Sequence, residues 1–238
     1  RSQMADEMTA EEWFDKGISL GELGRHGEAL FAFRQALEIN PQFAEAWYSL
    51  GIALGELGRY EEELDAYNKA IAINPQYAEA WNNKGVVLGR MGRHSEALDS
   101  YDKAVAISPQ FAEAWYNRGI ALGRLGKHED ALDAYIKATG INPEYAKAWN
   151  NLGVTLGELE RYEEALNAYY QATEINPQFA EAWNNLGAAL KRLGRDEEAQ
   201  EAYSKATEID RKYTPDQNIK FDLSELDATQ KASEITSE

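Results

Sequence analysis

Apolar and small residues return along the chain with a period of 34 residues, and polar residues fill most of the positions between them. Counted from Ala10, positions 4, 7, 8, 11 and 14 of a period follow the spacing of one helix face. In the second period these residues are Trp47, Leu50, Gly51, Leu54 and Leu57. The pattern predicts one helix, helix A, in the first half of each period.

The second half of each period carries another apolar stripe, which lies between a Gly-Arg link and an Asn-Pro pair. In the second period the link is Gly58-Arg59 and the pair is Asn74-Pro75. Glycine just after a helix supplies the left-handed residue that satisfies the last carbonyls, and proline cannot continue a helix. We therefore predict a second helix, helix B, and a helical hairpin in each period.

Three residue types mark all six periods at fixed positions. Tryptophan stands at position 4, in Trp13, Trp47, Trp81, Trp115, Trp149 and Trp183. Glycine stands at position 8, in Gly17, Gly51, Gly85, Gly119, Gly153 and Gly187. Alanine stands at position 27, in Ala36, Ala70, Ala104, Ala138, Ala172 and Ala206. Small residues at fixed positions allow helices to approach closely. A single hairpin cannot bury its own apolar face, so the repeated hairpins are expected to stack on one another.

The Trp, Leu, Gly, Ala and Asn-Pro residues, in this order and at this period, resemble the tetratricopeptide repeat over Ala10 to Tyr213. The resemblance implies an all-α fold, an α-α superhelix or TPR solenoid of six helical hairpins, whose A helices line a concave groove. The expected repeats are 10–43, 44–77, 78–111, 112–145, 146–179 and 180–213. Residues 1–9 form an N-terminal extension, in which 1–3 are expected to be a cloning remnant, and 214–238 an acidic C-terminal tail.

Composition narrows the function classes. Cysteine is absent, which excludes disulfides and a thiol nucleophile, and the net charge of −17 disfavours nucleic acid as a partner. His26, His94 and His128 all stand at position 17, too far apart in successive hairpins to share a metal, so we expect a structural role for them. No catalytic constellation, cofactor or membrane segment is evident, and we expect a non-catalytic cytoplasmic protein.

Positions 5 and 6 of helix A are not needed by the packing pattern and are rich in asparagine. The residues are Asn82, Asn83, Asn117, Asn150, Asn151, Asn184 and Asn185. An amide offers both a donor and an acceptor, as the backbone of an extended peptide requires. The arrangement is similar to the asparagine ladder of some peptide-binding solenoids. The alternative is that asparagine is simply a common choice at this position in the family.

The same helix face carries basic and aromatic candidates. Arg90, Arg124, Lys147 and Arg192 are expected to anchor acidic positions of a peptide, and Tyr48 and Tyr116 to contribute an apolar floor to the groove. The alternative for each basic residue is a solvated surface ion pair. The sequence thus predicts a scaffold that binds a protein or an extended peptide in its concave groove.

Two other functions remain open at this point. One is self-association, in which the chain engages another copy through the tail or through Phe31, Ile136 and Tyr170. The other is that the chain is the repeat module of a larger enzyme. Apolar residues at exposed positions mark some interfaces, although scattered ones are common on any surface.

Two departures from the pattern carry expectations about packing. Glycine recurs at position 12, in Gly21, Gly55, Gly89, Gly123 and Gly157, and we expect it to let the A helices pack unusually close; a groove kept wide is the alternative. Glu63 replaces the alanine of position 20, and we expect its carboxylate to reach solvent and the second repeat to be loosened.

Overall fold

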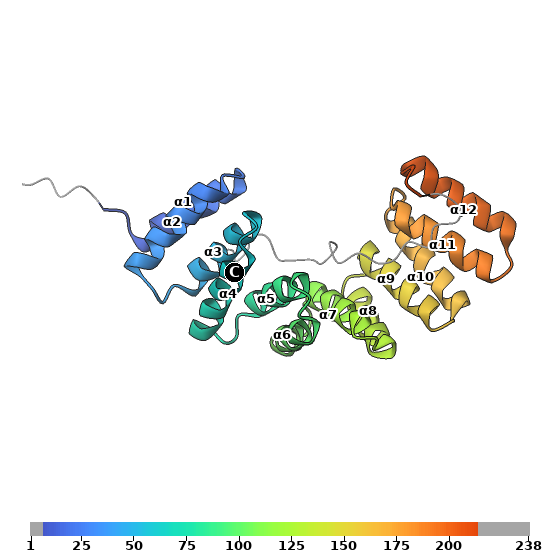
Figure 1. The fold of residues 1–238 in the computed structure, drawn as a ribbon, viewed down its shortest axis with the longest axis horizontal. Coiled ribbons are helices and arrows are strands. Elements are labelled where there is room, and N and C mark those ends of the chain that lie inside the picture. Colours follow the sequence, from blue (N-terminus) through green and yellow to red (C-terminus); the bar gives the residue numbers. More distant parts are fainter. Residues whose placement is uncertain (1–6, 214–238) are drawn as a thin grey trace, which may run out of the picture. The chain divides into compact units, whose positions relative to one another are not determined.

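The computed structural model describes residues 7–213, which form twelve α-helices and no strand (Figure 1). The A helices are α1 Ala10–Glu22, α3 Ala44–Glu56, α5 Ala78–Arg90, α7 Ala112–Arg124, α9 Ala146–Glu158 and α11 Ala180–Arg192. The B helices are α2 His26–Ile39, α4 Tyr60–Ile73, α6 His94–Ile107, α8 His128–Ile141, α10 Tyr162–Ile175 and α12 Asp196–Ile209. The predicted all-α class and the helical hairpins are confirmed, whereas the predicted tail and residues 1–6 lie outside the described part.

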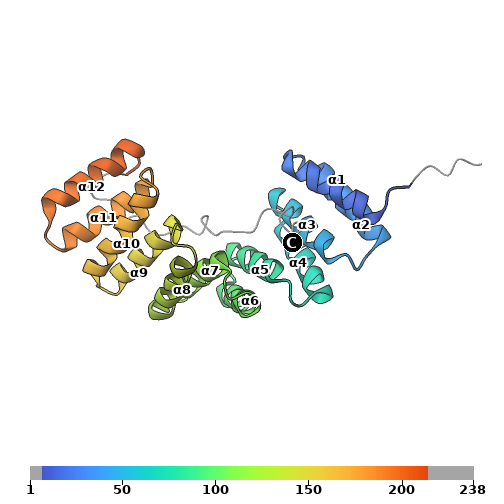
Figure 2. The ribbon, with the colours of Figure 1, turned by 180° about the vertical axis from the view of Figure 1, so that it is seen from behind.

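The described residues divide into two compact units, 7–109 with α1–α6 and 110–213 with α7–α12. Within each unit every A helix packs most extensively on the B helix of its own hairpin (Figure 2). Each B helix then contacts the next A helix of the same unit, as α2 contacts α3 and α8 contacts α9. Each unit is therefore a stack of three hairpins.

Tryptophan and proline are linked by a hydrogen bond that explains their fixed spacing. The indole Nε1 of Trp47 donates to the carbonyl of Pro41 at 2.9 Å, and Trp149 donates to Pro143 at 2.8 Å. The Trp81 and Trp183 indoles do the same with Pro75 and Pro177. The turn that enters each of these hairpins is thus tied to its A helix.

The glycines of position 8 make room for an aromatic ring of the partner helix. A Cβ placed on Gly153 would lie 2.5 Å from Cε1 of Tyr169, and one on Gly119 would lie 2.6 Å from Cε1 of Tyr135. The equivalent rings in the first and last hairpins are Phe33 and Tyr203. The expectation that these glycines permit close helix packing is therefore confirmed.

The glycines of position 12 behave differently, and the expectation of close packing is wrong for most of them. A Cβ on Gly21, Gly123 or Gly157 would meet no atom within 4 Å. These positions adjoin open space because no neighbouring helix passes over them. Gly55 alone among the four whose surroundings are described is crowded, by the carboxylate of Glu63 at 2.5 Å.

The A-to-B link needs a left-handed residue, and one repeat supplies it without glycine. Gly24, Gly58, Gly92, Gly126 and Gly194 have φ between 72° and 76°, and Glu160 at the same position has φ 58°. We expect Glu160→Gly to raise the free energy of unfolding by about 1 kcal/mol, since a residue with a Cβ is strained in this conformation. Urea unfolding measures the change.

The matched control for this variant is Gly194→Ala, which places a Cβ at the equivalent site with φ 74°. It is expected to lower the free energy of unfolding by a similar amount. An unchanged or lower stability of Glu160→Gly would contradict the assignment of strain to this link.

Candidate functional site

In the first unit, the candidate residues of α3 and α5 are joined to one another. The Nδ2 of Asn83 donates to the hydroxyl of Tyr48 at 3.3 Å, so position 6 of one repeat meets position 5 of the repeat before it. Tyr48 is fully buried, with its ring centroid 6.0 Å from that of Tyr67 and 5.0 Å from that of Tyr77. The expectation that Tyr48 contributes an apolar floor to the groove is wrong, because three rings pack together between the helices.

The second unit repeats this arrangement with amides. The Nδ2 of Asn185 on α11 donates to Oδ1 of Asn150 on α9 at 3.1 Å, again between position 6 and position 5 of the preceding repeat. Tyr116 is fully buried, 6.1 Å from Tyr135 and 5.0 Å from Tyr145 between ring centroids, so it too belongs to the core. These contacts give the polar residues of helix A a role in joining neighbouring repeats.

All seven candidate asparagines are buried, with exposed fractions of 0–8%. They are Asn82, Asn83, Asn117, Asn150, Asn151, Asn184 and Asn185. The Nδ2 of Asn150 has no hydrogen-bond partner within residues 7–213, although its Oδ1 accepts from Asn185. A buried amide donor without a partner costs about 1–3 kcal/mol.

The four basic candidates, by contrast, are exposed at the C-terminal or N-terminal turns of A helices. Arg90, Arg124 and Arg192 end α5, α7 and α11, and Lys147 lies in the first turn of α9. The guanidinium of Arg192 lies 5.9 Å from the ring centroid of Tyr162. Their charges are accessible to a ligand, whereas the amides are inside.

Glu63 is a buried acid that sequence reasoning placed in solvent. Its exposed fraction is 5%, and its Oε2 accepts a 2.8 Å hydrogen bond from the hydroxyl of Tyr67. Burial raises the pKa of Glu63 to about 7, while the bond from Tyr67 and the charge of Arg90 oppose the rise and Glu56 adds to it. The expectation fails because the missing side chain of Gly55 lets the carboxylate fold against α3. The only sign of this site in the sequence is that Glu63 stands where the other repeats have alanine.

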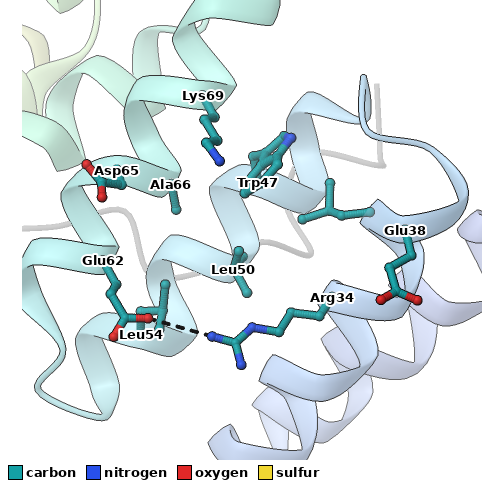
Figure 3. A pocket seen from close by; sticks show the side chains of 10 residues that line it. Arg34, Glu38, Trp47, Leu50, Leu54, Glu62, Asp65, Ala66 and Lys69 are labelled. Atoms are coloured by element: carbon teal, nitrogen blue, oxygen red, sulfur yellow. Dashed lines mark ion pairs between the residues drawn. The ribbon is translucent and has the colours of Figure 1, made fainter.

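The first unit has a hollow of about 420 Å³ between α2 and α4, over α3 (Figure 3). Arg34 reaches toward Glu62, with Nη2 and Oε2 3.6 Å apart, and the Nζ of Lys69 lies 4.5 Å from the ring centroid of Trp47. A hollow of about 340 Å³ lies between α4 and α6, lined by the equivalent Trp81, Glu96 and Lys103. Because equivalent positions line both, the hollows arise from the stacking of hairpins.

Other kinds of site were sought in the same residues. Within residues 7–213 no group of three or more His, Cys, Asp or Glu side chains is arranged to hold a metal ion. None of the described helices is long and apolar enough to cross a membrane. Phe31, Ile136 and Tyr170 are exposed by 57%, 52% and 42%, and their role in self-association stays a prediction.

Sequence models of known protein families match most of residues 7–213. Models described as "Tetratricopeptide repeat" match residues 14–78, 66–99, 112–145 and 180–213. A model described as "TPR repeat" matches residues 90–126 and 156–194. The chain belongs to the tetratricopeptide repeat family. The resemblance read from the sequence is thereby confirmed.

Solved structures of other tetratricopeptide repeat (TPR) proteins resemble this one. A crystal structure of MamA is 28% identical, with a TM-score of 0.64, and the match covers 68% of this chain and 95% of MamA. The crystal structure of YrrB, described as a TPR protein with an unusual peptide-binding site, is 26% identical, with a TM-score of 0.66 and coverage of 77% and 95%. The search of curated proteins gave no match.

A third structure, PilF of Pseudomonas aeruginosa, is 20% identical over 85% of this chain and 92% of PilF, with a TM-score of 0.76, and shows the fold alone. TPR proteins are generally non-catalytic scaffolds, and the TPR scaffold of this chain supports a role in protein–protein interaction. What it binds, and with which residues, is a separate matter.

Proposed function

We propose that this TPR protein binds an extended peptide along its A helices, with asparagines holding the peptide backbone and basic residues selecting acidic positions. The observation that carries the proposal is the buried Nδ2 of Asn150, which has no partner within residues 7–213. YrrB, a relative of the same family, is described as having a peptide-binding site, and this also supports the proposal.

The amides are suited to a peptide backbone because each one has a donor and an acceptor. Asn150 already uses its Oδ1 to accept from Asn185, so its Nδ2 is left to donate to a peptide carbonyl. The bond between these two asparagines also fixes the direction of both amides before any ligand arrives. A preorganised donor loses less entropy on binding than a mobile side chain does.

In this proposal the buried amides and the exposed basic residues contact different parts of the peptide. Asn117, Asn151 and the other buried amides would meet main chain, which makes that part of binding tolerant of sequence. The exposed Arg90, Arg124, Lys147 and Arg192 would meet acidic side chains or a terminal carboxylate. Because these charges are exposed to solvent, their share of the affinity should fall as salt is added.

The test replaces three asparagines of helices α7 and α9, Asn117, Asn150 and Asn151, by alanine together. Peptides selected from a random dodecapeptide library with the unmodified chain serve as probes, and calorimetry measures their dissociation constants. Affinity is expected to fall about tenfold or more, since each lost hydrogen bond costs about 0.5–1.5 kcal/mol.

The matched control replaces Asn68 on α4 and Asn167 on α10, which are exposed asparagines of B helices, by alanine. It should leave the dissociation constants unchanged. Equal affinities of the triple variant and the unmodified chain would reject the asparagine ladder, provided that circular dichroism shows the same helical content in both.

A further inference from the structure

Glu63 is buried, yet one of its carboxylate oxygens lacks a partner. Its Oε2 accepts from Tyr67 at 2.8 Å, while Oε1 has no hydrogen bond within residues 7–213. The stack itself does not require an acid here, because every other repeat has alanine at this position. Those alanines are Ala29, Ala97, Ala131, Ala165 and Ala199.

The carboxylate of Glu63 lies against the side of α3 that carries Tyr48 and Gly55. Tyr48, Ile52 and Gly55 are spaced by four and three residues, so they share one face of the helix. The Glu63 Oε2 lies 2.5 Å from where a Cβ of Gly55 would be, and Gly55 is itself partly exposed. Because Gly55 has no side chain to cover it, the carboxylate of Glu63 lies directly beneath this partly exposed position.

The acid also connects to the asparagines. The hydroxyl of Tyr67 that bonds Glu63 also interacts with Asn83, whose Nδ2 donates to the hydroxyl of Tyr48. Glu63, Tyr67, Asn83 and Tyr48 thus form one buried polar cluster across α3, α4 and α5. Glu63 is therefore linked, through Tyr67, to Asn83 of the proposed asparagine ladder.

Glu63 has no cation in direct contact. Within residues 7–213 no ion pair of 4 Å or less joins Glu63 to Arg90, whose charge lowers the Glu63 pKa, while the charge of Glu56 raises it. The Glu63 pKa of about 7 reflects burial without a cation in direct contact. A lysine or arginine side chain would supply both a positive charge in direct contact and the N–H donors that Oε1 needs.

We infer that the second repeat contains a subsite for a lysine or arginine side chain of the bound peptide, with Glu63 as the residue that recognises it. The inference rests on the proposed peptide-binding function and adds the residue class that the second repeat selects. The exposed Arg90 on α5 would then meet an acidic residue of the same peptide. The preferred ligand carries a basic residue and an acidic residue within a short distance.

A positional-scanning library of synthetic dodecapeptides tests this, with the unmodified chain, Glu63→Gln and Glu61→Gln as baits. The unmodified chain should enrich lysine and arginine at one peptide position, and Glu63→Gln should lose that enrichment by about tenfold or more, because a buried charge pair is broken. Glu61→Gln, which changes an exposed acid of the same helix α4, should retain it. Glu63→Ala provides a second variant that has the residue of the other repeats and is therefore compatible with the fold.

Each outcome decides between the claims. Loss of the basic preference in both Glu63 variants, with unchanged preference at other peptide positions, supports the subsite. If the library binds but the Glu63 variants select the same residues as the unmodified chain, the subsite is rejected and the peptide-binding function stands. If no peptide in the library binds the unmodified chain, the proposed function fails and the subsite fails with it.

Discussion

Replacing Gly153 by alanine is expected to lower the free energy of unfolding by about 2 kcal/mol. The new Cβ would lie 2.5 Å from Cε1 and 2.7 Å from Cδ1 of Tyr169, and this ring is 5% exposed. An aromatic ring enclosed in a core cannot move aside without losing contacts, and overpacking of this kind costs about 1–3 kcal/mol. Equilibrium unfolding in urea measures the change.

Gly157→Ala, four residues later in α9, is the matched control. A Cβ at Gly157 meets nothing within 4 Å, so alanine there should raise the free energy of unfolding by about 0.8–1 kcal/mol through its higher helix propensity. The two variants make the same chemical change in the same helix and are expected to differ in sign. A stabilising Gly153→Ala would mean that the Tyr169 ring has room to shift.

Glu63→Ala is expected to change the stability in opposite directions at the two ends of the pH range. The pKa of Glu63 is about 7 in the fold, raised from an ordinary value of 4.5 for glutamate, so the unfolded chain ionises first as the pH rises. The folded chain binds more protons between these values, and its stability therefore falls with rising pH. The full cost, reached above pH 7, is about 3 kcal/mol.

Alanine removes this cost but also removes the hydrogen bond from Tyr67 and the contacts of the side chain, which we take as about 1 kcal/mol. Glu63→Ala should therefore be more stable than the unmodified chain by about 2 kcal/mol at pH 8, and less stable by about 1 kcal/mol at pH 4. Urea unfolding at several pH values between 4 and 8 measures both free energies of unfolding and locates the pH at which they are equal.

Glu63→Gln is the control for the charge alone, because it keeps the shape of the side chain. At pH 4 it should match the unmodified chain, and at pH 8 it should exceed it by about 3 kcal/mol. Parallel stability curves for the unmodified chain and both variants from pH 4 to pH 8 would contradict the burial of an ionisable carboxyl at this position.

The stability cost bears on the proposed subsite. An alanine at position 20 serves five of the repeats, so the stack gains nothing from an acid that lowers its stability at neutral pH. A cation bound against Glu63 would lower its pKa and recover part of that cost. The same residue therefore links the stability of the first unit to the ligand that we propose for it.

The sequence by itself determined the hairpins and the family, because their signals are local. Helix A and helix B follow from apolar spacing, and the turns follow from glycine and proline, whose backbone preferences act within a few residues. The role of the position-8 glycines also followed, since a small residue facing a large ring such as Tyr169 recurs in register along the repeats.

Only the tertiary structure decided where the polar side chains lie. The expected apolar floor at Tyr48 and Tyr116 became part of the core, and Asn150 bonded Asn185 of the next repeat, because neighbouring helices pack beside these positions. Glu63 lies inside because Gly55, on another helix, leaves it space. Burial and partners depend on the distance between helices, and a periodic pattern along one chain does not contain that distance.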